Sequence, residues 1–160
     1  METAQLINLL NLTAHPEGGY FRETYRSVET TTNLEGNIRS QSTAIYFMLE
    51  GQNKSHFHRI KSDELWFFHH GEPIEILYFE HSILQRIILG NDFHLGQVAQ
   101  AVIPAHVWFA SRLLQGSGYG LVSCTVSPGF DFQDFEMATK ENLHKEFPLF
   151  TEIIEEMTLD

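Results

Sequence analysis

The segment that carries the most structural information in this chain is residues 51–71, GQNKSHFHRIKSDELWFFHHG. It places His56 and His58 two residues apart, and Glu64 follows a predicted turn at residues 61–63. Side chains alternate across a strand, so in an extended segment both imidazoles point to one face. A hairpin would then bring Glu64 alongside them. Two imidazoles and a carboxylate that converge in this way can bind a divalent metal, or act as a base with its orienting partner.

The chain beyond residue 20 reads as a series of short strands. We predict strands at 20–27, 43–49, 56–60, 64–68, 74–79, 85–89, 98–103, 107–111, 120–126 and 132–137. Turn signals such as Gly116-Ser117-Gly118 separate most of them. Many short strands at close spacing are typical of a sandwich or barrel, and not of a parallel α/β sheet. Strand 44–49 is apolar on both faces, so it needs cover on both sides.

The two ends of the chain have helical patterns. Leucines and isoleucine at helical spacing predict a short amphipathic helix at about 4–12, which the His15-Pro16-Glu17-Gly18-Gly19 segment ends. The tail predicts two short helices at about 140–157, interrupted by Pro148. We therefore expect a single domain, 1–160, with an all-β barrel at about 20–137 between these helices.

Composition and charge exclude several classes of protein. The net charge is −11, and the ten Lys and Arg residues are scattered, which argues against binding to nucleic acid. The single cysteine, Cys124, cannot form a disulfide within the chain and reads as a buried packing residue in a reducing compartment. The first residues lack the basic start of a secretory signal, and no apolar run is long enough to span a membrane. We expect a soluble cytoplasmic protein.

Five blocks of sequence resemble the cupin superfamily and, within it, the group of unknown function called DUF985 or cupin_5. These blocks are residues 15–27, 42–49, 55–76, 102–111 and 121–136, in the family's order. The first half of the general cupin signature is matched by Gly51, His56, His58, Glu64 and Gly71. The resemblance implies a double-stranded β-helix, which is a jelly-roll barrel, assembled as a homodimer.

The chain departs from the second half of the general cupin signature. His106 stands where that signature has a glycine, and Phe109 stands at the position of its last metal-ligating histidine. Three protein ligands can still form a metal site, because catalytic sites keep one position open. In the narrower family the firm elements are those matched by His58, Arg59, Asp63, Glu64 and Trp66. The resemblance therefore supports a pocket better than it supports a metal.

Further residues are candidates for the same site. The predicted catalytic residues are His58, Glu64 and Tyr46, with the tyrosine as a general acid beside a His–carboxylate base. A buried Glu64 among aromatic residues must be paired, and it could instead only complete a network with Arg59 or His58. The predicted ligand-binding residues are Arg22, Ser55, Arg59, Trp66, Trp108 and Phe109. Arg22 could bind an anionic group of a ligand, or form a salt bridge to Glu17 or Glu64.

Three functions remain open from the sequence. The first is binding of a small molecule in the barrel interior, with a His/Glu pair and aromatic walls. The second is a sugar epimerase or isomerase, in which the base abstracts a proton beside a carbonyl. The third is a metal-dependent enzyme with Fe, Mn or Zn on His56, His58 and Glu64. Whether the protein is an enzyme is left open.

Overall fold

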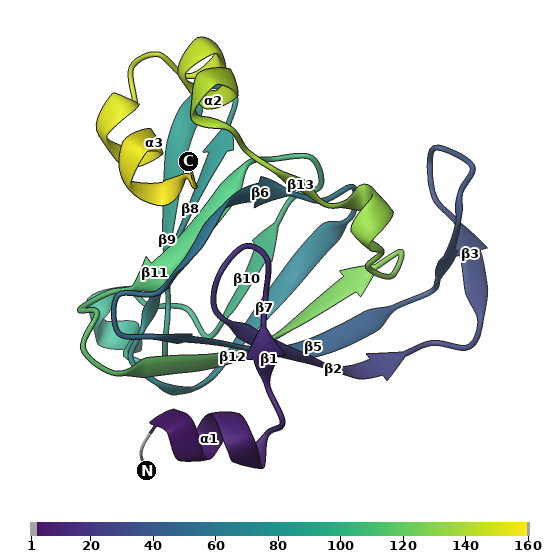
Figure 1. Ribbon diagram of the computed structural model, residues 1–160, viewed down its shortest axis with the longest axis horizontal. Coiled ribbons are helices and arrows are strands. Elements are labelled where there is room, and N and C mark those ends of the chain that lie inside the picture. The colour runs from purple at the N-terminus through teal and green to yellow at the C-terminus, as the bar shows by residue number, and fades with distance from the viewer. Residues whose placement is uncertain (1–2, 160) are drawn as a thin grey trace.

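The computed structural model describes residues 3–159, and its two large antiparallel sheets face each other (Figure 1). The larger sheet has six strands in the order β1-β2-β5-β12-β7-β10. The smaller has five in the order β13-β6-β11-β8-β9. Neighbouring strands pair antiparallel throughout both sheets. The predicted all-β, jelly-roll class is confirmed.

The strands are short and are joined by tight turns. The six-stranded sheet contains β1 (Thr13–Ala14), β2 (Tyr20–Arg26), β5 (Thr43–Glu50), β12 (Tyr119–Ser127), β7 (Asp63–Gly71) and β10 (Gln100–Ile103). The five-stranded sheet contains β13 (Glu136–Met137), β6 (Lys54–Arg59), β11 (Phe109–Leu113), β8 (Ile74–Glu80) and β9 (Ile83–Leu89). A separate hairpin of β3 (Thr30–Thr32) and β4 (Ile38–Ser40) projects from the barrel (Figure 1).

Three short helices and two 3₁₀ turns complete the fold. They are α1 (Thr3–Leu9), η1 (Phe93–Leu95), η2 (Phe132–Asp134), α2 (Lys140–Glu146) and α3 (Thr151–Met157). The strand predicted at 132–137 is wrong in its first half. There the Asp131 side chain accepts a hydrogen bond from Gln133 N and starts η2, and only Glu136 and Met137 form a strand, β13.

The main core lies between the two sheets. Because side chains alternate along each strand, every second residue of each sheet points into the barrel. Fully or almost fully buried members of this core are Phe47, Leu49, Trp66, Val122 and Cys124 from the six-stranded sheet, and Ile74, Ile76, Leu89 and Phe109 from the five-stranded sheet.

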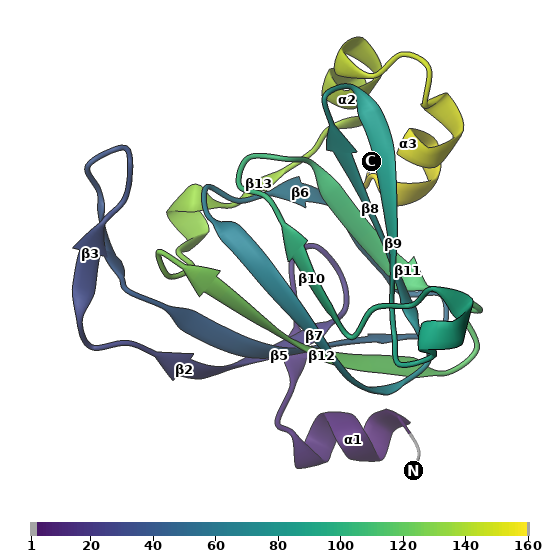
Figure 2. The same cartoon turned by 180° about the vertical axis from the view of Figure 1, so that it is seen from behind.

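A second core lies on the outer face of the five-stranded sheet, beneath α2 and α3 (Figure 2). Leu77 and Phe79 point outward because they alternate with the inward-facing Ile74 and Ile76. The Phe79 ring stacks on Phe147 at 3.9 Å between centroids. The five-stranded sheet is therefore apolar on both faces, and the C-terminal helices supply the cover that its outer face requires.

The loop from His15 to Gly19 closes over β6 and directs Glu17 into the barrel. The Glu17 carbonyl oxygen accepts a hydrogen bond from His56 N at 2.8 Å, which ties the loop to the strand edge. Gly18 and Gly19 have φ values of 106° and 75°. A Cβ on Gly18 would lie 1.9 Å from the Lys54 carbonyl oxygen, so only glycine fits this approach.

A β-bulge interrupts the alternation of β6. Opposite β11, His58 pairs with Phe109 and Ser55 pairs with Ser111, so three steps along β6 match two steps along β11. As a result Ser55 and His58 reach the same carboxylate, while Phe57 joins the outer core. Simple alternation along β6 therefore does not predict that Ser55 and His58 share the inner face.

Replacement of Gly18 by alanine should destabilise the protein strongly. The new Cβ adds a backbone clash to the strain of a positive φ, so we expect a loss of about 3 kcal/mol or more in the free energy of unfolding. Urea denaturation of Gly18→Ala and of the unsubstituted protein measures this loss.

Gly36→Ala is the matched control, because Gly36 has φ 84° but no atom lies within 4 Å of its added Cβ. This variant should lose only about 1–2 kcal/mol, from the left-handed conformation alone. Equal losses in the two variants would contradict the tight packing of the loop against β6.

Candidate functional site

A buried carboxylate–imidazole pair lies between the N-terminal loop and β6. Glu17 Oε2 lies 3.0 Å from His58 Nε2, and Glu17 Oε1 accepts a hydrogen bond from Ser55 Oγ at 2.8 Å. The side chains of Glu17 and His58 are less than one tenth exposed. The loop supplies Glu17, and the bulged strand β6 supplies both of its partners.

The His58 ring is held on both edges and on one face. Its Nδ1 lies 2.7 Å from the His56 carbonyl oxygen, so both ring nitrogens contact oxygen atoms. Phe109 packs on the ring with 4.1 Å between centroids. The residue at the position of the usual last cupin ligand thus forms an apolar wall against His58.

The pair favours its ionised form despite burial. Burial acts to raise the pKa of Glu17, but the charge and hydrogen bond of His58 outweigh it, and the pKa is lowered. Burial acts to lower the pKa of His58, but the charge and hydrogen bond of Glu17 outweigh it, and the pKa is raised. Opposite charges in contact therefore compensate for much of the desolvation.

Glu64 is a second buried carboxyl group near this pair. It is only 8% exposed and lies on the same face of β7 as the core residue Trp66. Burial and then the charge of Glu17 raise the pKa of Glu64 to about 7, although His58, Cys124 and Trp66 act in the opposite direction. Two carboxyl groups thus share one imidazole, and Glu64 is the one that keeps its proton toward neutral pH.

Cys124 and Trp66 pack against Glu64 from neighbouring strands. Burial and the charges of Glu64 and Glu17 raise the pKa of the Cys124 thiol, so this cysteine is a buried neutral group, as its apolar sequence context predicted. Trp66 Nε1 is buried and lies close enough to Glu64 to lower the pKa of that carboxyl group, but within the described residues it meets no partner at strict hydrogen-bond geometry. The Trp66 indole also lies 5.6 Å from the Phe47 ring in an edge-to-face arrangement.

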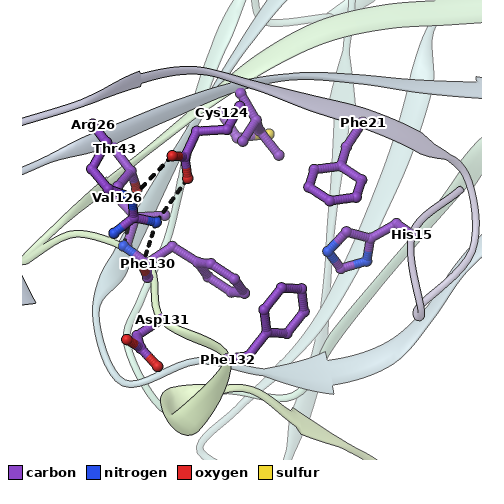
Figure 3. Close-up of a pocket in the computed structure, with 11 residues that line it drawn as sticks. His15, Phe21, Arg26, Thr43, Cys124, Val126, Phe130, Asp131 and Phe132 are labelled. Carbon is purple, nitrogen blue, oxygen red and sulfur yellow. Dashed lines mark hydrogen bonds and ion pairs between the residues drawn. The ribbon is translucent and has the colours of Figure 1, made fainter. Parts of the chain in front are cut away.

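A pocket of about 260 Å³ opens beside this buried group, between the six-stranded sheet and the segment 130–132 (Figure 3). Its walls are mostly apolar. The lining residues are His15, Phe21, Glu23, Arg26, Thr43, Ile45, Cys124, Val126, Phe130, Asp131 and Phe132. His58 and Glu64 do not line it. They lie behind His15 and Cys124, which contact both the pocket and the buried group.

His15 links the pocket to the Glu17–His58 pair. Its ring points into the pocket (Figure 3), and its Nδ1 accepts a hydrogen bond from Glu17 N at 3.3 Å. Nδ1 also lies 3.3 Å from Glu17 Oε2. Burial lowers the pKa of His15 in spite of the nearby Glu17, so the ring is neutral at pH values near 7.

Two charged residues of the pocket, Arg26 and Glu23, are paired with each other. Arg26 donates from Nε and Nη2 to the two carboxylate oxygens of Glu23, at 2.9 and 2.7 Å, and from Nη2 to the Phe130 carbonyl oxygen. This bidentate pair forms one rim of the pocket (Figure 3). Asp131 adds a second carboxylate on the same side.

The donors expected for a metal do not fit a divalent cation here. His56 Nδ1 lies 2.7 Å from the Glu17 carbonyl oxygen, and both nitrogens of His58 are engaged. Within residues 3–159 no group of three or more His, Cys, Asp or Glu side chains is placed to hold a metal ion. The structure therefore does not assemble His56, His58 and Glu64 as a metal centre.

Arg22 and Tyr46 lie on the opposite side of the six-stranded sheet from His58 and Glu64. They pair across β2 and β5, with the Arg22 guanidinium 5.7 Å from the Tyr46 ring centroid. Tyr46 also contacts His69, whose ring hydrogen bonds to Ser123. Because Phe47 points into the core, its neighbour Tyr46 must point outward. The expectation that Arg22 and Tyr46 reach the barrel interior is wrong.

Two more predicted ligand-binding residues lie outside the interior. Trp108 belongs to the outer core and donates to Glu146 at 3.3 Å. Arg59 stacks over Trp108 at 4.2 Å and pairs with Glu136. Trp108 is therefore a structural residue beneath the C-terminal helices, and the prediction that it binds a ligand is wrong. Arg59 lines a separate surface pocket with Lys61 and His106, so its role in ligand binding stays a prediction. Ser55, Trp66 and Phe109 do lie around the buried pair.

Sequence reasoning missed Glu17 and His15 as site residues. The sequence pattern of residues 15–19 predicts a helix-ending turn, and it suggests Glu17 only as a partner for Arg22. A carboxylate directly before two glycines was the available signal. The glycines allow the loop to pass against β6, so the residue before them points inward.

These features place the protein in the class of cupin-fold proteins. Oxalate decarboxylase from Bacillus subtilis superimposes with a TM-score of 0.53 at 14% identity, over 90% of this chain and 36% of that chain, which supports the shared fold alone. The family Cupin_5, described as Cupin superfamily (DUF985), matches residues 4–138. The chain belongs to this family.

The names of three relatives with higher identity state no function. A hypothetical protein from Leishmania major has a TM-score of 0.94 and 34% identity, with all of both chains covered. Protein SO0799 from Shewanella oneidensis has a TM-score of 0.90 and 35% identity, with 99% of this chain and 98% of that chain covered. The uncharacterized protein YML079W of Saccharomyces cerevisiae is 35% identical over 81% of this chain and 72% of that protein.

Glu64→Gln should make stability less dependent on pH. The pKa of Glu64 in the folded protein, about 7, lies above the ordinary glutamate value of 4.5. The folded state therefore holds this proton more tightly and loses stability as pH rises between these values. Glutamine carries no such proton. Between about pH 5 and about pH 8, the free energy of unfolding of the variant should therefore rise by about 2 kcal/mol relative to that of the unsubstituted protein.

Urea denaturation at the two pH values measures this gain. Glu29→Gln serves as the control, because Glu29 is an exposed carboxylate on the same chain. Its change over the same range should stay below about 0.5 kcal/mol. A pH dependence in Glu64→Gln as steep as that of the unsubstituted protein would rule out a buried protonated Glu64.

Proposed function

We propose that this protein binds a small organic molecule in the pocket between the six-stranded sheet and residues 130–132. The observation that carries the proposal is a concave, mostly apolar pocket with aromatic walls, into which one polar side chain, His15, points. Small-molecule sites generally combine apolar walls with a few placed polar groups. The Glu17–His58 pair behind the pocket fixes the position of His15.

The buried polar residues act as a support for this site. The Glu17 carboxylate accepts a hydrogen bond from Ser55 and contacts His15 and His58. One carboxylate thus joins the loop, β6 and the pocket. A ring held in this way loses little conformational freedom when a ligand arrives, which favours binding. Membership of the Cupin_5 family agrees with a pocket in the barrel, while the relatives' names give no ligand.

A ligand screen by thermal shift should find stabilising compounds, and Val126→Phe should abolish their effect. Val126 lines the pocket from β12 and is 7% exposed, so a phenyl group there occupies the ligand's space. The pocket has room for the larger side chain, and we expect the variant to fold. A bound ligand stabilises the folded protein by RT ln(1 + [L]/Kd). This stabilisation should disappear when the phenyl group fills the pocket.

Thr125→Phe is the control for the screen, because Thr125 is the neighbouring residue of the same strand and faces the other side of the sheet. It should keep the ligand-induced shift. Absence of any stabilising compound from a broad metabolite set would count against a binding function.

Acid–base catalysis by the buried groups is a second candidate function. The observation that favours it is a carboxyl group with a pKa of about 7 near an imidazole and a second carboxylate, the combination that an isomerase or epimerase needs. Against it, only His15 of the connected histidines and glutamates lines the pocket.

The two candidates differ in what happens to a bound compound. Stabilising compounds from the screen should be recovered unchanged from incubation in deuterium oxide, with no solvent deuterium at carbon. Proton NMR and mass spectrometry measure this exchange. Deuterium incorporation that is lost in Glu64→Gln would establish catalysis in place of simple binding.

In the described part of the chain no helix is long and apolar enough to cross a membrane.

The predicted homodimer also remains a proposal. The outer face of the six-stranded sheet carries Leu65 and Phe67, which are only partly buried within one chain. We assign the second copy to this face, because the C-terminal helices cover the outer face of the other sheet.

A further inference from the structure

The size of the pocket limits what it can hold. An engineered apolar cavity of about 150 Å³ binds benzene. The pocket described above has a volume of about 260 Å³, so the part of a ligand that it encloses is about the size of a single ring with a substituent. The enclosed part is therefore smaller than most cofactors.

The walls favour a flat ring. Phe21, Phe130 and Phe132 surround the opening together with His15 (Figure 3). The His15 and Phe21 rings meet nearly perpendicularly at 4.6 Å, and Phe130 meets Phe132 in the same way at 4.9 Å. Rings at these angles present both edges and faces, so a planar guest can stack or make edge contacts.

The polar groups disfavour an anion. Arg26 is the one guanidinium among the lining residues, and its Nε and Nη2 already donate to Glu23 and to the Phe130 carbonyl oxygen. Asp131 adds a second carboxylate whose charge also acts on the Arg26 guanidinium. A carboxylate or phosphate ligand would lose its hydration without gaining a free positive partner.

Two neutral polar side chains also line the pocket, Thr43 and His15. Thr43 Oγ1 accepts a hydrogen bond from Phe130 N, whereas His15 presents a donor. His15 Nδ1 accepts the Glu17 N–H, so in the neutral ring the proton is on Nε2. No described residue pairs with Nε2, and the ring points into the pocket (Figure 3). An N–H directed at a bound molecule selects a hydrogen bond acceptor.

We infer that the pocket takes an uncharged planar ring compound, of the size of a substituted benzene, with a carbonyl-type acceptor directed at His15 Nε2. This inference rests on the proposed function and names its ligand class. It assigns His15 as the specificity-determining residue and the three phenylalanines as the ring-binding surface.

Four ring compounds of equal size test the inference. Benzamide is neutral and carries an acceptor, benzoate is an anion, benzamidine is a cation without an acceptor, and isopropylbenzene is apolar. Ligand-observed NMR titration of the full chain at about pH 7.5 should rank benzamide first. Benzoate should bind at least about tenfold more weakly, because it brings an unpaired charge.

His15→Phe keeps a ring at this position and removes the donor. In this variant benzamide should lose its advantage over isopropylbenzene, while Tyr46→Phe on the outer face should keep the original ranking. Val126→Phe should remove binding of all four compounds and so shows that they occupy this pocket. If His15→Phe does not fold, the ranking in the unsubstituted protein decides alone.

The outcomes separate the inference from the proposed function. Tighter binding of benzoate or benzamidine, or equal binding of isopropylbenzene and benzamide, would overturn the ligand class and leave a binding pocket. If none of the four binds but larger metabolites stabilise the protein, the inferred size is wrong. If no compound of either set binds, the proposed function fails as well.

Discussion

The contact between Glu17 and His58 is the interaction on which the interior of this barrel depends. It joins the N-terminal loop to β6 through a hydrogen-bonded pair that is almost fully buried. Removal of either partner would leave an uncompensated charge in an apolar core, which costs several kcal/mol. Ser55 and His15 then attach to the same carboxylate, so one side chain sets the positions of three others. The geometry of the pocket therefore depends on this arrangement.

The strand pattern of the barrel could be predicted from the sequence because alternation and turn signals are local. Nine of the ten expected strands have a counterpart, with ends that differ by a few residues. The projecting β3–β4 hairpin was not predicted, since its polar residues lack an alternating pattern. At 132–137 the sequence is rich in phenylalanine, but a capping aspartate begins a 3₁₀ turn and overrides that preference.

The site was harder to predict, for two physical reasons. A bulge of one residue in β6 exchanges the faces of neighbouring side chains, and nothing in the sequence around His56 announces it. Glu17 comes from a loop distant in the sequence, so its contact with His58 depends on tertiary packing. His58, Glu64, Trp66 and Phe109 were nevertheless placed together, because adjacent strands of a predicted barrel bring them there. Tyr46 and Arg22 were misplaced because strand 44–49 is apolar on both faces.

The protonation of Glu64 near neutral pH has a consequence for calorimetry. Glu64 changes its protonation near neutral pH, within reach of the charges of Glu17 and His58. A guest that alters the local electrostatic potential would shift this equilibrium and exchange a fraction of a proton with the solvent. The measured heat of association would then include the ionisation enthalpy of the buffer. Titrations in buffers of different ionisation enthalpy would reveal how closely the pocket and the acidic interior are coupled.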